Sequence, residues 1–396
     1  MTSPAFPRLL QEARRISREI AATAAPAVDR DARFPHESVA AMQEAKLLSA
    51  AVPESHGGAG LTLAELGKLC HVMAQGCGSS GMVLAMHTIQ VACIVRHAGD
   101  SAFFDGVLRA LVTEQTLLAS MTSEVGTFGA TRRSQCAIEP ADDGRFTLGK
   151  DATTGSYCAH ADAILVTARR DAEAAPGDQV LAYIRRADCA LQQKGSWDTL
   201  GMRGTCSPAF RIDATAAREQ ILPVDYGVIS ALTMVPYSHV LWAALWTGIA
   251  VDAYGRAGAY VRGQARNNPG TTPPTALRLA ELTVKMQSLR HHWVEVANEF
   301  DALPPPADLP ADQPHPLTRV GWSLKFNTLK TDASERTPEI VHGALQIVGI
   351  LGYKNDTPFS LGRQYRDALS GALMISNDRI AAQSANLLLV FKDDQE

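Results

Sequence analysis

The feature that most constrains the fold is a change of hydrophobic period along the chain. From Met1 to about Ala119, apolar residues recur at helical spacing, as in segments 61–73 and 82–95. Between about 120 and 222 the apolar runs are short and separated by turns, which is typical of antiparallel strands. After Tyr226 the helical period returns in long segments. The pattern predicts an α+β protein with a β part between two helical parts.

These three parts are expected to form three domains. We place an N-terminal α-helical domain at residues 1–119, a middle antiparallel β domain at 120–225 and a C-terminal four-helix bundle at 226–396. A length of 396 residues is sufficient for two or three domains. The strands are expected at 137–148, where a polar turn divides the run, and at 163–168, 179–184 and 209–212. The bundle helices are expected at 229–264, 275–302, 317–348 and 363–391.

Charge and cysteine content argue against several classes of protein. The 37 Lys and Arg residues are outnumbered by 41 Asp and Glu, so no basic excess is available to neutralise a nucleic-acid backbone. The seven cysteines are scattered and none belongs to a C-x-x-C pair, which argues against a zinc site or a disulfide framework. We therefore expect no nucleic-acid partner and no metal.

The uncharged stretch 227–251 does not predict a membrane span. Residues 236–239 (Pro-Tyr-Ser-His) interrupt it, and the apolar run that remains is shorter than the roughly 20 residues that a span needs. Residues 1–21 carry Arg and Glu at helical spacing and lack the apolar segment of a secretory signal. A cytoplasmic location is expected.

Several short strings follow one another in an order that resembles a known family. They are Arg33-Phe34-Pro35 with Val52-Pro53-Glu54, Ala159-His160-Ala161-Asp162, Leu200-Gly201-Met202-Arg203-Gly204-Thr205, Gln346-Ile347-Val348-Gly349 with Gly352-Tyr353, and Tyr365-Arg366-Asp367-Ala368. Each string alone is weak. Together, and in register over nearly the whole chain, they resemble the acyl-CoA dehydrogenase superfamily.

The resemblance implies a cofactor, a substrate and an assembly. It implies FAD held between the β domain and the bundle, and an acyl-CoA or acyl-carrier thioester as substrate. In the family a glutamate removes the acyl α-proton while the β-hydrogen leaves as hydride to the flavin. It also implies a homo-oligomer, dimer or tetramer, in which one subunit's Gln346 loop reaches a neighbour's cofactor. Either an electron-transfer partner or oxygen would complete the reaction.

The resemblance also assigns roles to individual residues. It places flavin contacts at Met121, Thr122, Ser123, Thr127, Thr153, Thr154, Arg266, Gln346, Ile347, Gly349 and Asn377. It places Phe128, Ala152, Arg256 and Ile375 on the substrate side.

Three departures from the family pattern bear on the chemistry. Ala152 stands where the family has a tryptophan that covers the flavin, which leaves space at the ring unless Tyr157 or Phe128 refills it. Gln264 stands where the family has an arginine for the FAD pyrophosphate, so Arg262 or Arg266 would have to supply the cation.

The third departure is the loss of the catalytic glutamate, because its position falls on Ile375. Asp378, about one helical turn further on, and Asp252, on the other helix that carries the base in some members, are the remaining candidates for a catalytic carboxylate.

These departures favour a specialised reaction over standard β-oxidation. We expect an FAD-dependent oxidoreductase that acts on an acyl thioester through flavin and oxygen chemistry, because such chemistry needs space at the ring and no α-proton base. One alternative is an ordinary α,β-dehydrogenase with a relocated base. Another is a catalytically silent subunit that lends its Gln346 loop to an active partner.

Overall fold

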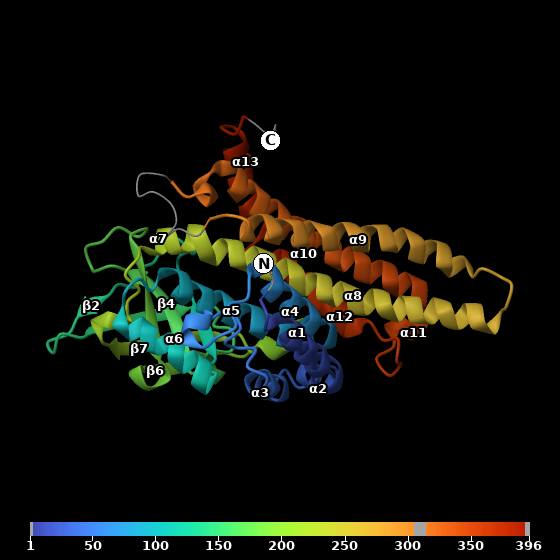
Figure 1. The fold of residues 1–396 in the computed structure, drawn as a ribbon, viewed down its shortest axis with the longest axis horizontal. Coiled ribbons are helices and arrows are strands. Elements are labelled where there is room, and N and C mark those ends of the chain that lie inside the picture. Colours follow the sequence, from blue (N-terminus) through green and yellow to red (C-terminus); the bar gives the residue numbers. More distant parts are fainter. Residues whose placement is uncertain (1–2, 305–313, 393–396) are drawn as a thin grey trace.

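The computed structural model describes residues 3–304 and 314–392, and it has helical parts at both ends of the chain with strands between them (Figure 1). The N-terminal helices are α1 (Phe6–Arg15), α2 (Ala22–Arg30), α3 (His36–Glu44), α4 (Leu63–Gly76), α5 (Gly78–His97) and α6 (Ala102–Glu114). The strands are β1 (Leu118–Met121), β2 (Glu139–Pro140), β3 (Phe146–Ala152), β4 (Ala163–Arg169), β5 (Gln179–Arg185), β6 (Cys189–Lys194) and β7 (Ala209–Ala216). The C-terminal helices are α7 (Tyr226–Ile229), α8 (Val235–Asn267), α9 (Pro274–Asp301), α10 (Val320–Val348), α11 (Ile350–Tyr353), α12 (Gly362–Leu373) and α13 (Asn377–Leu388). The predicted α+β fold class is confirmed.

The strands form two small sheets rather than one antiparallel set. In the first sheet, in the order β1-β4-β5, β1 pairs parallel to β4, with Leu118 opposite Ala163, and β4 pairs antiparallel to β5. The second sheet, in the order β2-β3-β7-β6, is antiparallel throughout. The parallel pair differs from the sequence prediction, because a short strand directly after a helix carries too few residues to show its own period.

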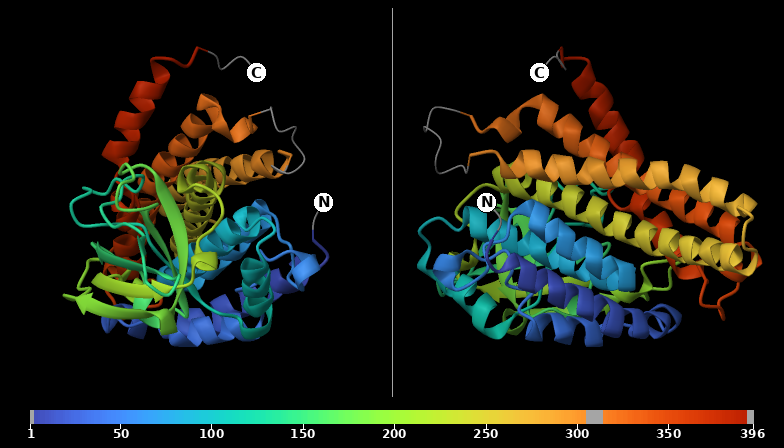
Figure 2. Two further views of the ribbon diagram at one scale, coloured as in Figure 1. Left: turned by 90° about the vertical axis from the view of Figure 1, so that its left-hand side faces the viewer. Right: turned by 45° about the vertical axis from the view of Figure 1, so that its right-hand side comes forward.

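Three long helices, α8, α9 and α10, lie side by side and form the elongated half of the molecule (Figures 1 and 2). Helix α4 packs against α8 at very short range. A Cβ added to Gly248 would lie 2.2 Å from the main-chain oxygen of His71, so only glycine allows this approach. A carboxylate at the end of α9 joins that helix to the start of α4, since Asp301 accepts hydrogen bonds from the first two amides of α4, each at 2.9 Å.

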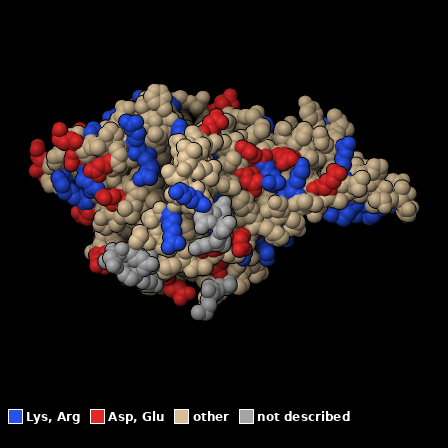
Figure 3. Space-filling view, turned by 90° about the horizontal axis from the view of Figure 1, so that it is seen from above, with Lys and Arg blue, Asp and Glu red and all other residues tan. Residues whose placement is uncertain are grey.

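Two helical stretches, Gly78–His97 and Tyr226–Asn267, are long and apolar enough to cross a membrane. In the most apolar 18-residue window of each, 89% and 78% of the residues are buried inside the protein. Their apolar composition is therefore explained by burial in the core of the protein. On the face seen in Figure 3, basic and acidic side chains are interspersed rather than gathered by sign.

The helix predicted at 363–391 is divided into α12 and α13, and α13 stands away from the bundle (Figure 2). The break falls at Ile375, whose φ of +49° is in the left-handed region that β-branched residues rarely adopt. The buried Lys330 of α10 holds this corner, since its ammonium donates to the main-chain oxygen of Ile375 at 2.9 Å and to Oδ1 of Asn377 at 2.6 Å.

Candidate active site

A cavity with a volume of about 640 Å³ lies where the β sheets meet the helical parts. Its walls come from α5, from the segments that follow β1 and β3, from the turn 199–207, from the start of α8 and from the α12–α13 corner. Among the described residues, no Asp or Glu lines it. Its charged side chains are Arg366 and Arg379, and a histidine, His239, joins them.

The β side of the cavity is rich in hydroxyl groups. Thr122, Ser123, Thr153 and Thr154 all line it, so the structure brings together four of the predicted flavin residues. The Ser123 hydroxyl donates to the main-chain oxygen of Thr154 at 2.8 Å and accepts from the Thr154 amide at 3.2 Å. This pair of bonds joins the segment after β1 to the segment after β3.

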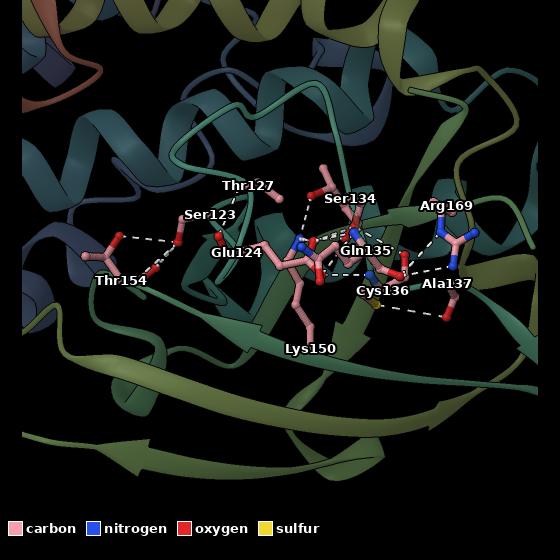
Figure 4. A network of polar contacts seen from close by, with 11 residues as sticks. Ser123, Glu124, Thr127, Ser134, Gln135, Cys136, Ala137, Lys150, Thr154 and Arg169 are labelled. Carbon is pink, nitrogen blue, oxygen red and sulfur yellow. Dashed lines mark hydrogen bonds and ion pairs between the residues drawn. The ribbon is translucent and has the colours of Figure 1, made fainter. Parts of the chain in front are cut away.

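A buried ion pair fixes the loop that carries Thr122 and Ser123 (Figure 4). The Glu124 carboxylate accepts from the Ser134 hydroxyl at 2.6 Å and from the Cys136 amide at 2.7 Å. The Lys150 ammonium lies 3.7 Å from that carboxylate and donates to the main-chain oxygen and hydroxyl of Thr167 at 2.7 and 2.8 Å. Burial lowers the pKa of Lys150, and Glu124 opposes this shift. The pair thus joins the loop to β3 and β4.

Other predicted β-domain residues lie outside the cavity wall. Met121 and Ala152 are buried in β1 and β3, and the hydroxyl of Thr127 donates to the main-chain oxygen of Glu124 at 2.9 Å. Phe128 is 92% exposed, with a φ of +50°, so it does not fill the space that the missing tryptophan leaves. Tyr157, the other candidate for filling that space, is buried outside the cavity wall, where its hydroxyl donates to the main-chain oxygen of Leu118 at 3.0 Å.

The two predicted catalytic carboxylates do not line the cavity. Asp252 accepts from the Arg256 guanidinium at 3.1 Å and from the side-chain Nε2 of Gln364 at 2.5 Å, within the bundle. Asp378 is exposed in the first turn of α13. Arg256, predicted on the substrate side, also lies outside the wall, where it donates to the main-chain oxygen of Pro358 at 3.1 Å.

The α12–α13 corner places Ile375, predicted on the substrate side, on the cavity wall together with Leu373 and Met374. Asn377 points elsewhere, because its side chain bonds Lys330 and Ser334. Burial lowers the pKa of Lys330 to about 8. Arg379, which the sequence prediction did not include, donates to the main-chain oxygens of Phe128 and Gly129 and so joins α13 to the loop over the cavity.

The remaining predicted flavin residues lie at the other end of the bundle. Gln346 borders a second hollow of about 520 Å³ together with Arg278, Glu281 and Lys285. Ile347 is buried in the last turn of α10, and Gly349 follows that helix with a φ of +69°. Arg266 is exposed in the last turn of α8. Within one chain these four residues do not meet the large cavity.

His239 is the main cavity residue that the sequence analysis did not single out as functional. It lies on α8 among apolar residues, is 3% exposed and lines the cavity. Its Nδ1 lies 3.1 Å from the main-chain oxygen of Phe326. Burial and the positive charge of Lys330 lower the pKa of His239 to about 4. The only signal in the sequence was a histidine that interrupts an otherwise apolar stretch.

No group of three or more His, Cys, Asp or Glu side chains in residues 3–304 and 314–392 could hold a metal ion. The seven cysteines, all within these ranges, are unpaired, and five of them are buried.

Comparison with known proteins identifies the family. Residues 6–115 match the profile of the acyl-CoA dehydrogenase N-terminal domain, and residues 225–375 match that of the acyl-CoA dehydrogenase C-terminal domain. The chain belongs to the acyl-CoA dehydrogenase family. Members of this family are flavin-dependent oxidoreductases, so the predicted family, enzyme class and flavin cofactor are confirmed.

Three relatives illustrate the range of chemistry on this fold. The amino sugar nitrososynthase DnmZ of Streptomyces peucetius is 26% identical over 360 residues, which cover 87% of this chain and 84% of that protein. The structure of TdsC, a dibenzothiophene monooxygenase from Paenibacillus sp. A11-2, with FMN and indole superposes with a TM-score of 0.83 at 20% identity, covering 97% of this chain and 98% of TdsC. Butyryl-CoA dehydrogenase from Megasphaera elsdenii superposes with a TM-score of 0.82 at 18% identity, covering 98% of this chain and 99% of the dehydrogenase.

Proposed function

We propose that this member of the family is a flavin-dependent monooxygenase rather than an acyl-CoA dehydrogenase. The observation that carries the proposal is the cavity wall, which holds Ile375 at the position of the family's glutamate and, in the described chain, no carboxylate at all. Dehydrogenation needs a base for the α-proton, and such a base is typically worth 10²- to 10⁴-fold in rate.

The other groups on the wall do not replace that base. The hydroxyls of Thr122, Ser123 and Thr154 are ordinarily far too weakly basic at neutral pH. The imidazole of His239 is unprotonated, but a pKa of about 4 makes it a weak base. Oxygenation has no such requirement, because the two electrons come from the reduced flavin instead of from a C–H bond of the substrate.

The residues present fit a flavin. The hydroxyls of Thr122, Ser123 and Thr154 would hydrogen-bond the polar edge of the ring, and the Glu124–Lys150 pair would keep their loop in place. Arg379 suits the flavin phosphate, since it lines the cavity and no carboxylate among the described residues pairs with it. When bound, the reduced flavin would supply the two electrons that activate oxygen.

The proposed reaction balances in atoms and electrons. One atom of O₂ is inserted into the substrate and the other leaves as water. The two electrons and two protons that this requires come from the reduced flavin, which becomes oxidised. A separate reductant, such as a flavin reductase, must then restore it. Of the relatives named above, TdsC is named a dibenzothiophene monooxygenase and DnmZ an amino sugar nitrososynthase, a name that denotes the formation of a nitroso group.

We also propose that the working enzyme is a homo-oligomer. Gln346, Ile347, Gly349 and Arg266 lie far from the cavity of their own chain, at the outer end of the bundle. In a homo-oligomer they would reach the flavin of a second copy, as the family resemblance implies. The predicted acyl thioester remains a candidate substrate, and the experiment below tests it.

The experiment compares two reactions of the purified, flavin-loaded protein. In the first, the oxidised protein is mixed anaerobically with butyryl-CoA and with palmitoyl-CoA, and the visible absorbance of the flavin is followed. We expect almost no bleaching. In the second, the flavin is reduced with dithionite and exposed to isotopically heavy oxygen gas with indole as a trial substrate. We expect a product that carries one heavy oxygen atom.

Butyryl-CoA dehydrogenase is the control that validates the anaerobic assay. Rapid bleaching of the present protein by either thioester would overturn the proposal in favour of a dehydrogenase with a base outside the cavity wall. Failure to bind FMN or FAD at micromolar concentrations would favour the catalytically silent subunit. Reoxidation that releases only hydrogen peroxide, with each of several trial substrates, would also count against oxygen transfer.

A further inference from the structure

His239 offers the cavity a hydrogen-bond acceptor. Its ring is held in place by the Nδ1 contact with the main-chain oxygen of Phe326, on the neighbouring helix α10. A carbonyl oxygen can only accept, so Nδ1 must carry the hydrogen. In the neutral ring Nε2 then has a free lone pair, and no hydrogen bond from any described residue engages it.

The surroundings keep this ring neutral. His239 is buried, and the Lys330 ammonium on α10 opposes a second positive charge, while the charge of Glu335 favours the charged form of Lys330. With its pKa lowered to about 4, the imidazole remains an acceptor throughout the physiological pH range.

The cavity disfavours a cationic ligand, because no carboxylate among the described residues lines it. Its two arginines are already engaged, Arg366 by Asp29 and Arg379 by main-chain oxygens, and much of the remaining wall is apolar, with Met82, Met86, Trp242 and Leu373 among its residues. Burying a charge without a partner is strongly unfavourable, whereas an apolar surface gains from such a wall. A ligand that fills the cavity shields this acceptor from water, so a ligand with a donor group is favoured over one without it.

We propose that the cavity binds a neutral, largely apolar molecule that donates an N–H or O–H hydrogen bond to Nε2 of His239. This rests on the proposed function in one respect: the oxygenated substrate occupies the same cavity. His239 is thus a substrate-binding residue that selects for a donor group on an otherwise apolar compound.

The test compares two probes of nearly equal shape, indole and benzofuran. Indole carries an N–H where benzofuran carries a ring oxygen. Dissociation constants are measured by calorimetry on the oxidised, flavin-loaded protein, so that no turnover takes place. We expect indole to bind on the order of tenfold more tightly than benzofuran, because only indole satisfies the acceptor.

Two substitutions separate the binding role of His239 from its structural role. His239→Asn keeps an amide donor near the place of Nδ1 and removes the acceptor at Nε2, so we expect the preference for indole to fall to about twofold or less. His239→Gln keeps a polar atom near the place of Nε2 and should retain part of the preference. Circular dichroism shows whether each variant is folded.

His71 provides the matched control. Its Nδ1 also lies 3.1 Å from a main-chain oxygen, that of Ala244, and burial lowers its pKa to about 4, but it does not line the cavity. His71→Asn should therefore leave the preference unchanged.

Three outcomes would overturn the inference. They are equal binding of the two probes by the unmodified protein, a preference that survives in folded His239→Asn, and no binding of either probe up to millimolar concentration. None of them depends on oxygen transfer. A protein that shows the preference but transfers no oxygen would contradict only the proposed function.

Discussion

Ile375 combines an apolar side chain with a left-handed backbone at the wall of the cavity. We predict that Ile375→Glu raises the rate at which butyryl-CoA bleaches the flavin anaerobically by about 10²-fold, since it restores a base to the family position. Stopped-flow absorbance measures the rate. Ile375→Gln is the matched control, because it has the same shape without a proton-accepting carboxylate. An equal gain in both variants would mean that space, and not basicity, limits the reaction.

Counting along the family strings selected residues that share one cavity where each of them directly follows a strand. Thr122 and Ser123 follow β1, Thr153 and Thr154 follow β3, and all four line the cavity. It could not place Phe128, whose exposure depends on a loop with positive φ at both Phe128 and Gly129. Counting along the strings also gave no reason to select His239, because a single histidine on an apolar helix forms no motif with a second functional residue.

At the scale of elements, the loop after β1 depends on the Glu124–Lys150 pair. Glu124→Gln leaves a buried ammonium without its counter-charge, so we predict a loss of about 3–5 kcal/mol in the free energy of unfolding. Weaker flavin binding should accompany it, since Ser123 is next to Glu124. Urea denaturation and flavin titration measure the two effects.

Two further variants test that assignment. The double variant Glu124→Gln, Lys150→Met removes both charges and should recover part of the lost stability. The exposed pair Lys285–Glu339 is the matched control, and Glu339→Gln should cost less than about 1 kcal/mol. If Glu124→Gln costs no more than Glu339→Gln, the buried pair does not hold the loop.

The end of α8 bears on the choice between FAD and FMN. Gln264, at the position of the family's pyrophosphate-binding arginine, is already engaged by the hydroxyls of Tyr260 at 3.2 Å and Thr275 at 2.5 Å. We predict that the unmodified protein binds FMN and FAD with similar affinity. Gln264→Arg should strengthen FAD binding by about tenfold and leave FMN unchanged, because only FAD has a pyrophosphate.

Fluorescence titration with both flavins measures these affinities, and Gln264→Met is the control that breaks the same hydrogen bonds without adding charge. A preference of the unmodified protein for FAD of about 100-fold would show that other groups hold the pyrophosphate.

The division of the last predicted helix shows why element boundaries were harder to predict than element types. The periodicity of 363–391 is continuous, and no Gly or Pro marks the break at Ile375. The corner depends on Lys330, which lies 45 residues earlier and donates to the Ile375 carbonyl. A contact between segments so far apart leaves no trace in local periodicity.

At the scale of the whole molecule, the order of helical, β and helical parts followed from hydrophobic period alone, because each part has a period of its own. The arrangement of these parts did not. The parallel pairing of β1 with β4 and the close contact of α4 with α8 both join segments that are distant in the sequence. The site lies where such segments meet, so its composition could be predicted only through the family resemblance.

Buried histidines should make the folded protein sensitive to acid. Burial lowers the pKa of His71, His87, His97 and His239 to about 4, whereas unfolded histidine titrates near 6.5. Between these pH values the unfolded chain binds more protons, so each histidine lowers the free energy of unfolding by at most about 1.4 kcal/mol for every pH unit of acidification. Asp367 acts in the opposite direction below its pKa of about 6, since burial keeps it protonated in the folded state. We predict that the free energy of unfolding, measured by urea denaturation, falls markedly from pH 7 to pH 5, and that it falls less in His239→Asn. An equal fall in both proteins would mean that the His239 ring is already protonated in the folded state.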